Sequence, residues 1–451
     1  MKKKTIKSIA ATMVLTFGIT AMPMPALAVS SNIVAETENK NTLTISQIQD
    51  LAVIYNNTNQ SLQLKKKQLA LQEQMLRNNR RDLEYQMQSI ASSSGMGGAA
   101  ATIGAALGNL KAQLEAEKAK ENPDAALIAQ LNAQIAAMEL QYGSAVASEE
   151  SMATSLQSSL DSALSGLEQM NDTLDTMEDG RNDLDKSIAD LESQMRYTAA
   201  ALSLNALQLE KAIELMQDQI ALTEKSVKIA ELQQKLGMNI ATDVSTAQAS
   251  LVEAKKNLED QKETLSNIKR SINILIGRNA GNPLEIVPMN LPVAIDPAPA
   301  YTQQLIDKFV DANYSLKTLE RDKTNLRDSV KNDMGSDELQ EIDYNILAKD
   351  QEIDNKKQAI EDDLKAMIAK INSDGEAYKV SRQKYVNEKK TFEFTKKKYE
   401  LGMVSELALR QAELSLKSAE MTNMQNGYQY YLDWQKYYLA ERGIDVSALS
   451  F

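Results

Sequence analysis

Long stretches of this sequence carry apolar residues at the three- and four-residue spacing of a helix that buries one face. The clearest stretch ends at 236, and its last part carries two such lines. One follows a heptad a/d pattern and the other a strict spacing of seven: Leu209, Ile213, Met216, Ile220 and Val227 in the first, and Leu215, Leu222, Ile229 and Leu236 in the second. Two adjacent apolar lines predict a helix with neighbours on two sides, in an antiparallel bundle or in a closed ring of helices.

The same spacing recurs along most of the chain. Thr44 with Gln47 is a possible capping box for the first helix, Asn122-Pro123-Asp124 predicts a helix boundary, and Gly143 predicts a turn or kink. The expected helices cover 44–90, about 149–236, 241–276, 301–332, about 65 residues up to Gly402, and 406–442. We therefore expect an all-α fold of long antiparallel helices, as in a coiled coil or the protomer of an α-barrel.

Two glycine turns interrupt these helices and are copies of each other. The first lies at Lys235-Leu236-Gly237-Met238 and the second at Glu400-Leu401-Gly402-Met403, where glycine supplies the positive φ of a tight turn. A shift of 165 residues superposes the turns and also three positions in the helices that follow them: Ala247 on Ala412, Ser250 on Ser415 and Leu251 on Leu416. This register indicates a duplicated unit.

The duplication predicts the domain organisation. We expect a first helical repeat over 29–278, a linker over 279–300 that holds five of the eight prolines, and a second helical repeat over 301–451. The helix starts are 258 residues apart but the turns only 165, so the first repeat has 93 extra residues. We expect these to form a helical insertion over about 80–172. Its small, glycine-rich part at 92–110 is either a membrane-touching tip or a flexible turn before a closely packed helix.

Composition limits the available chemistry. The chain has neither Cys nor His, which removes thiolate and imidazole nucleophiles, disulfides and the usual zinc ligands, and it has no nucleotide-binding loop. We expect no enzymatic activity, no cofactor and no metal site. The formal charge of −12 argues against nucleic acid as a partner.

The first 28 residues have the pattern of an export signal. Four lysines precede a short apolar core at Ile9–Thr20 and the small-x-small site Ala26-Leu27-Ala28. Cleavage after Ala28 changes the formal charge from −12 to −16, because four lysines and no acids are lost. An uncleaved N-terminal anchor is the alternative. No later stretch is long and apolar enough for a transmembrane helix, so we expect an exported mature chain without one.

The glycine turns and their flanks resemble the TolC-like outer-membrane efflux proteins. The segments that carry the likeness are Leu43-Thr44-Ile45, Asn56-Asn57, Gly237 to Val244 with Ala247 and Ala249, and Tyr399 to Ser405. The likeness covers most of the chain outside 80–172. It implies a homotrimer in which four helices of each subunit form a hollow barrel, and a passive conduit of an efflux or secretion assembly as the function.

The resemblance also implies partners. The glycine turns would meet the hairpin tips of a membrane-fusion adaptor protein joined to a transporter of the inner or cytoplasmic membrane. The residues that carry over as adaptor-contacting tips are Leu236, Gly237, Met238, Leu401, Gly402 and Met403. Asp243 is a candidate for an acid that lines the mouth, or else an acid favoured at a helix start by the helix dipole. The alternative function is a structural or regulatory coiled-coil protein of the cell envelope.

Some features depart from the family pattern. The family places β-strands that cross the outer membrane between the helices of each half, and neither 333–337 nor the insertion has strand patterning. The resemblance implies an outer-membrane location, but the missing strands argue against it. We therefore expect a location outside the cytoplasm, in the cell envelope. The family's acidic rings fall on Ala408 and Gln411, and the arginine that pairs with the acid at Asp243 falls on Val404.

An aromatic cluster lies near the C-terminus. It comprises Tyr428, Tyr430, Tyr431, Trp434, Tyr437 and Tyr438. These side chains either stack on sugars of the cell wall or pack against the start of the other half of the chain.

Overall fold

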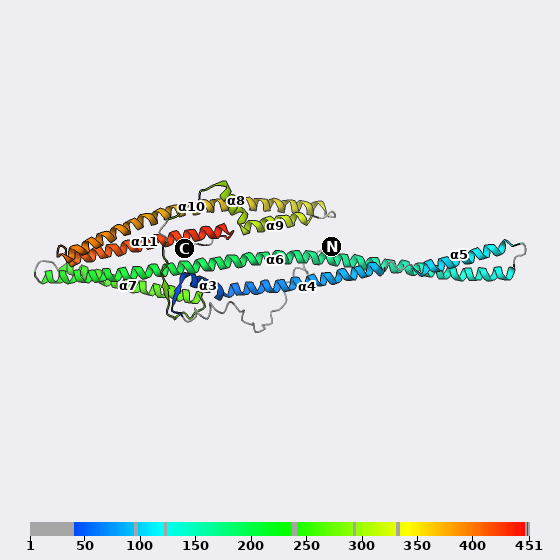
Figure 1. Ribbon diagram of the computed structural model, residues 1–451, viewed down its shortest axis with the longest axis horizontal. Coiled ribbons are helices and arrows are strands. Elements are labelled where there is room, and N and C mark those ends of the chain that lie inside the picture. The colour runs from blue at the N-terminus through cyan, green and yellow to red at the C-terminus, as the bar shows by residue number, and fades with distance from the viewer. Residues whose placement is uncertain are drawn as a thin grey trace. The chain divides into compact units, whose positions relative to one another are not determined.

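The computed structural model describes residues 40–93, 98–120, 124–236, 241–291, 295–330, 334–446 and 449. Within them the chain forms helices and two three-residue strands, which confirms the all-α class (Figure 1). In chain order the elements are β1 (Thr42–Thr44), α3 (Ile45–Tyr55), α4 (Asn57–Ser93), α5 (Ala99–Lys118), α6 (Ala125–Lys235), α7 (Ala241–Leu275), β2 (Glu285–Val287), α8 (Gln303–Ala312), α9 (Tyr314–Asp328), α10 (Ser336–Glu400) and α11 (Glu406–Glu441). The expected export segment lies outside the described residues.

Two compact units are distinguished by their internal contacts. Among the described residues, the first contains 40–56, 198–295 and 378–428, and the second contains 57–197, 296–377 and 429–449. Helices α6, α10 and α11 contribute residues to both units. Across the described ranges, none of the helices combines the length and the apolarity that crossing a membrane requires.

In the first unit, α6 and α7 form an antiparallel pair. The first apolar line of α6 supplies Ile213 and Ile220, which cluster with Leu258 of α7, and each of the three is 8% exposed. Polar contacts flank this seam. Lys255 Nζ lies 2.6 Å from a carboxylate oxygen of Glu224. Burial of one face of each helix therefore holds the pair together, as the heptad spacing predicts.

The second apolar line of α6 faces α11. Leu222 of α6 and Leu414 of α11 line a cavity of about 220 Å³, and Leu215 lines another of about 320 Å³ that α10 and α11 share. On the far side of α11, the Tyr378 ring of α10 lies 2.9 Å from where a Cβ on Gly427 would stand. The four long helices of this unit therefore follow the order α7, α6, α11, α10, with α7 and α10 outermost (Figure 1), and the short helix α3 packs on α7.

The sequence pattern does not predict the two short strands of the first unit. β1 pairs in parallel with β2, and Leu43 stands opposite Ile286. Both side chains are buried, at 0% and 2% exposure. Only three residues of each strand take part, which is too few for a period of two to be recognised in sequence. The expected linker over 279–300 therefore contains a strand.

Two of the expected helices are each broken at an asparagine. Asn56 separates α3 from α4 with φ −72° and ψ 112°, and Asn313 separates α8 from α9 with φ −64° and ψ 117°. The Asn313 side chain accepts a hydrogen bond of 2.9 Å from the Leu316 N–H, which caps α9. The predictions of unbroken helices over 44–90 and 301–332 are therefore wrong, because asparagine favours a helix start over a helix interior. The capping box at Thr44 and Gln47 is confirmed.

In the second unit, α6 begins at Ala125, directly after the predicted helix boundary, and continues without a break into the helix expected from about 149. The Asp124 carboxylate accepts a hydrogen bond of 2.9 Å from the Ala126 N–H and so caps the helix. Gly143 lies inside α6, so of the turn or kink expected at this position the turn is wrong. The start of α6 packs on α5 through a small apolar core: Leu107, Leu114, Leu131 and Ile135. Burial of these side chains offsets the roughly 1 kcal/mol by which a glycine in the helix interior, here Gly143, destabilises a helix.

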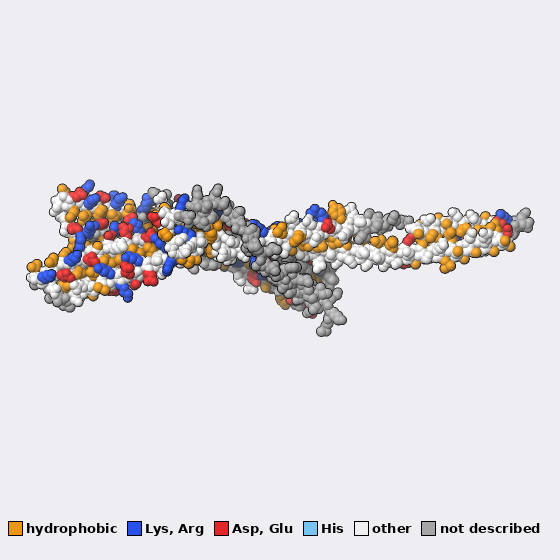
Figure 2. Space-filling view, turned by 90° about the horizontal axis from the view of Figure 1, so that it is seen from below, with side chains coloured by type: hydrophobic (Ala, Val, Ile, Leu, Met, Phe, Trp, Pro, Cys, Tyr) orange, Lys and Arg blue, Asp and Glu red, His pale blue; other side chains and the backbone are white. Residues whose placement is uncertain are grey.

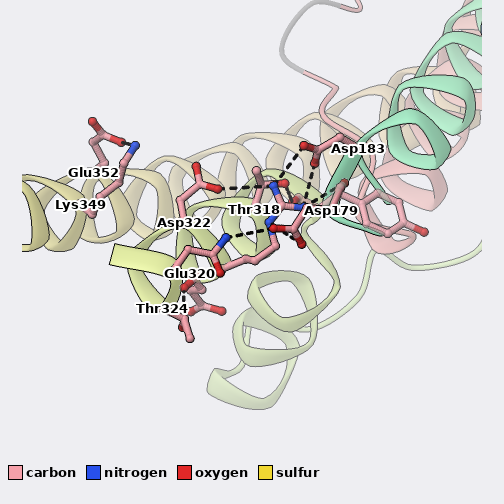
Figure 3. A network of polar contacts seen from close by, with 11 residues as sticks. Asp179, Asp183, Thr318, Glu320, Asp322, Thr324, Lys349 and Glu352 are labelled. Atoms are coloured by element: carbon pink, nitrogen blue, oxygen red, sulfur yellow. Dashed lines mark hydrogen bonds and ion pairs between the residues drawn. The ribbon is translucent and has the colours of Figure 1, made fainter. Parts of the chain in front are cut away.

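Arg321 of α9 links that helix to α6 in the second unit. Its guanidinium donates hydrogen bonds of 3.1 and 3.2 Å to the two carboxylate oxygens of Asp183, and Asn325 Nδ2 donates one of 3.0 Å to Asp179. Figure 3 shows Asp179 and Asp183 pointing toward α9. A two-pronged arginine–carboxylate contact fixes both distance and orientation, so it sets the register of α9 on α6.

Two of the C-terminal aromatic residues, Tyr430 and Tyr437, pack inside the second unit. The rings of Tyr437 and Phe309 of α8 have centroids 5.2 Å apart, and the Tyr430 hydroxyl donates a hydrogen bond of 2.9 Å to the Asp296 carbonyl. Tyr430 and Tyr437 are 3% and 4% exposed. For these two tyrosines the structure favours packing over sugar stacking, but their partners belong to the linker and the second repeat and not to the other half of the chain.

Gly443 ends α11 in a left-handed conformation with no room for a side chain. Its φ is +86°, the Ile444 N–H donates to the Leu439 carbonyl at 3.1 Å, and a Cβ would stand 2.0 Å from the Ala312 carbonyl oxygen. This is the terminating motif in which the amide after the glycine bonds back to a carbonyl in the last helical turn.

Gly443→Ala is expected to destabilise the protein more than Gly402→Ala. Both add the cost of a left-handed alanine, about 1–2 kcal/mol, but only position 443 adds a clash with backbone, since a Cβ on Gly402 meets nothing within 4 Å. Urea denaturation followed by circular dichroism gives the two midpoints. Equal shifts would contradict the packing assigned to Gly443.

Candidate functional site

The turn between α10 and α11 is a short, exposed hairpin tip in the first unit. Gly402 has a φ of +71°, and the Met403 N–H donates to the Lys398 carbonyl at 2.8 Å. The Ser405 hydroxyl then accepts a hydrogen bond of 3.2 Å from the Ala408 N–H and caps α11. Local backbone chemistry therefore reverses the chain within a few residues.

The apolar residues predicted at the tips are exposed. Leu401 is 75% and Met403 67% exposed, and Leu236, the last described residue before the first turn, is 73% exposed. Gly237 and Met238 lie outside the described residues. Asp243 lies in α7, but its side chain is outside what the structure describes. Large apolar side chains at such exposure are free to contact a partner.

Ion pairs between α6 and α11 place both hairpin tips at the same end of the first unit. Lys225, near the end of α6, lies 2.5 Å from Glu406, which follows the Gly402 turn. Lys417 of α11 contacts Asp218 of α6 and lies 3.3 Å from Glu214. The hydrogen bond with Lys225 holds the pKa of Glu406 below its usual range. Since α6 and α10 both run toward their turns, the two tips point the same way.

Sequence reasoning missed these ion pairs. Lys225 and Glu406 are 181 residues apart, and Lys417 and Asp218 are 199 apart. No local spacing connects residues so distant, and the chain carries 112 charged residues from which to choose. The only sequence signal for these pairs is the 165-residue shift. It relates the two hairpins and so suggests that α6 and α11 are neighbours.

The strongest acid–base perturbation lies away from the tips, in the second unit. Asp433 of α11 is 4% exposed, and burial, followed by a hydrogen bond with Asp374 of α10, raises the pKa of Asp433 to about 7. Burial acts to raise the pKa of Asp374 too, but hydrogen bonds with Asp433 and Lys370 hold it below its usual range. Asp433 therefore keeps its proton to a higher pH than Asp374 does.

The surroundings of this carboxyl pair are crowded and polar. Lys370 Nζ lies 2.9 Å from Asp374 and 4.0 Å from Asp433, and Gln429 Nε2 donates to Asp433 at 3.1 Å. Lys436 of α11 lies over the Tyr197 ring of α6, and burial lowers the pKa of this lysine. Asp433 is too buried to meet a substrate in solution, so the pair joins α10 to α11 and is a poor candidate for catalysis. The described residues include no group of three metal-binding side chains.

Comparisons with known proteins give matches in structure only. No protein-family model matches the chain, and no curated protein matches it. The outer membrane protein VceC from Vibrio cholerae is 12% identical, with 61% of this chain and 75% of that chain covered and a TM-score of 0.43. CusC is 14% identical, with 61% and 74% covered and a TM-score of 0.44. The CmeC outer membrane channel of Campylobacter jejuni is 13% identical, with 62% and 69% covered and a TM-score of 0.42.

These matches are TolC-family channels. The resemblance stated from the glycine turns is to the same family. At these identities and TM-scores the function of the chain has to be argued from its own hairpins.

The Asp433 carboxyl is expected to make stability depend on pH. Its pKa is about 7 in the folded chain and about 3.9 when unfolded, so the folded state binds more protons between these values. Stability from this group is therefore greatest below pH 4, falls as the pH rises to 7 and is level above. Asp433→Asn should flatten this decline, as measured by thermal unfolding from pH 4 to pH 8.5.

The matched control for this prediction is Asp354→Asn, which changes an exposed aspartate of the same α10 that supplies Asp374. It is expected to leave the pH profile of the wild type unchanged. A decline that persists in Asp433→Asn would show that other groups cause it.

Proposed function

We propose that this chain is an exported, TolC-like passive conduit of an efflux or secretion assembly, built from three copies. One observation carries the proposal. Two antiparallel hairpins lie side by side in one layer with their tips at the same end, and the outermost helices α7 and α10 carry exposed apolar side chains, Val252 and Phe394. A layer of this kind is completed either by folding on itself or by further copies, and a ring of copies encloses a channel.

The two tips are the proposed docking site for a membrane-fusion adaptor. Leu236, Leu401 and Met403 are exposed apolar side chains, and Gly402 leaves its backbone uncovered. Leucine and methionine adapt to a partner's surface, and a glycine lets another backbone approach closely. Gly237 and Met238 carry the same role by the 165-residue shift, and Asp243 is proposed as an acid of the mouth.

The energy for transport would come from a partner transporter in the inner or cytoplasmic membrane. The chain itself would act outside the cytoplasm, in the cell envelope, after removal of 1–28. Its two repeats, 29–278 and 301–451, would each supply one hairpin to the ring, and the insertion over about 80–172 would extend from the first repeat.

A structural or regulatory coiled-coil protein of the envelope is the second candidate. The buried seam between α6 and α7 supports it, since a pair of helices packed in this way is also the basis of a rod-shaped spacer. A rod does not need two separate hairpins held in register by ion pairs, and this favours the conduit.

Purified mature protein is expected to assemble into a ring of three copies with an open centre. Multi-angle light scattering gives the mass, and negative-stain electron microscopy viewed along the axis shows whether the centre is hollow. A monomer, or a solid two-copy rod, would exclude the conduit and favour the spacer.

Gly402→Asp is expected to abolish adaptor binding while helix content and assembly stay unchanged, because a charged side chain would stand where a partner backbone has to approach. A photoreactive amino acid at Leu401 should cross-link the native adaptor in intact cells, and the same probe should fail in the Gly402→Asp background.

The control for this experiment is Gly335→Asp, at the other end of α10, where a Cβ also meets nothing within 4 Å. It should leave the Leu401 cross-link intact. Mass spectrometry identifies the linked protein, and cross-linking that persists in Gly402→Asp would remove the tip from the docking site.

A further inference from the structure

A cleft of about 380 Å³ lies between α6 and α9 within the second unit. Its lining includes side chains of both helices: Asp183, Asp185 and Lys186 of α6, and Tyr314, Lys317 and Thr318 of α9. Sites for small molecules combine an apolar surface with a few polar groups in fixed positions. The cleft has both, because an aromatic ring lies among charged and hydroxyl groups.

Contacts within the second unit hold the two walls of the cleft in place. The Arg321 guanidinium of α9 donates to both carboxylate oxygens of Asp183, which joins α9 to α6. At the start of α9, the Tyr314 N–H donates a hydrogen bond of 3.2 Å to the Gly443 carbonyl. The cleft is therefore formed before a ligand arrives, and this reduces the conformational cost of binding.

Two lysines of the cleft form no ion pair with a described residue. Lys186 Nζ donates a hydrogen bond of 3.1 Å to the Ser315 hydroxyl, and Lys317 Nζ lies 5.9 Å from the centroid of the Tyr314 ring. The positive charge of Lys186 acts on the carboxyl of Asp190, one turn further along α6. Lys317 is exposed and is therefore the stronger candidate for binding an anion.

The two aspartates of the cleft each have a basic partner. Asp183 binds Arg321, Asp185 contacts Lys66, and both carboxylates are about half exposed. An ionised carboxylate has about four acceptor positions. Both aspartates can therefore accept hydrogen bonds from a ligand while their charge stays balanced.

The unpaired lysines are a local feature and do not belong to a large basic surface. On the face that Figure 2 shows, basic and acidic side chains are intermixed, and the whole chain has a formal charge of −12. At long range this charge repels a simple anion. A ligand of the cleft therefore needs contacts besides the one between its anionic group and lysine.

The lining matches a ligand with three kinds of group. Lys317 requires an anionic group, Asp183 and Asp185 require hydroxyl donors, and the half-buried Tyr314 ring requires an apolar face. Inorganic phosphate has no apolar face, and a fatty acid has no hydroxyl groups beside its carboxylate. A carboxylated sugar has all three, since the C–H groups on one side of its ring form an apolar face.

We propose that this cleft binds a carboxylated sugar of the cell wall. Lys317 binds the carboxylate, and the Tyr314 ring packs on one face of the sugar. Asp183 and Asp185 accept hydrogen bonds from the sugar hydroxyl groups. The inference rests on the proposed function for the location in the envelope, where the wall supplies such sugars, and it makes the second unit an anchor to the wall.

N-acetylmuramic acid tests the proposal, because it is N-acetylglucosamine with an added lactyl group that carries a carboxylate. Saturation-transfer-difference NMR on the full mature chain is expected to give a Kd for N-acetylmuramic acid at least about tenfold lower than for N-acetylglucosamine. Inorganic phosphate at the same concentration should not displace it. Equal affinities for the two sugars, displacement by phosphate, or no binding of either sugar would each overturn the proposal.

Lys317→Gln is expected to remove the preference for N-acetylmuramic acid, because the carboxylate loses its cation. Lys390→Gln is the matched control. It removes the same charge from an exposed lysine of α10 in the first unit that forms no ion pair with a described residue. A preference that persists in Lys317→Gln, or is lost in the control as well, would contradict the role assigned to Lys317.

Two substitutions at Tyr314 separate the ring from its volume. Tyr314→Phe should keep the affinity for N-acetylmuramic acid, and Tyr314→Leu should weaken it several-fold, because leucine lacks the flat face of the ring. Circular dichroism shows whether each variant is folded. Equal affinities of the two folded variants would overturn the packing of the sugar on the ring.

The sugar titration and the assembly of the chain are read separately. Wild-type rings of three copies that bind neither sugar would overturn the cleft and leave the conduit standing. A monomeric chain that binds N-acetylmuramic acid would overturn the conduit and support the cleft.

Discussion

The first unit depends on α6 being buried on two sides at once. Its first apolar line packs on α7 through Ile213 and Ile220, and its second, with Leu222, faces α11. A helix with one apolar stripe can bury it against a single partner helix, whereas a helix with two stripes needs a partner on each side to bury both. This requirement makes the two hairpins neighbours, although their turns are 165 residues apart in the chain.

A layer of helices differs from a closed bundle in having edges. In a bundle every helix buries its apolar face inside one chain, but α7 and α10 have exposed apolar side chains, Val252 and Phe394. Exposed apolar side chains grouped in this way are typical of surfaces that bind a partner. The apolar pattern thus accounts for the order of the long helices in the layer.

Much of this fold could be predicted from sequence because its signals are periodic or local. Heptad spacing located the long helices, and the glycine repeat located both tips. The breaks at Asn56 and Asn313 were missed because the apolar spacing continues across them while a single capping residue changes the backbone. The contacts of Lys225 with Glu406 and of Lys417 with Asp218 were beyond sequence reasoning, because they depend on the pairing of hairpins.

The surroundings of the turn glycines separate structural from functional roles. Gly402 and Gly443 both have a positive φ, +71° and +86°. In both turns the N–H of the residue after the glycine donates a hydrogen bond to a carbonyl of the preceding helix. At Gly443 the Ala312 carbonyl occupies the space of a side chain, so packing within the chain accounts for the glycine. At Gly402 that space is empty, and backbone conformation is the only internal reason for it. An exposed glycine between the exposed side chains of Leu401 and Met403 leaves room for another backbone to approach, and this is the basis of the docking role proposed for the tip.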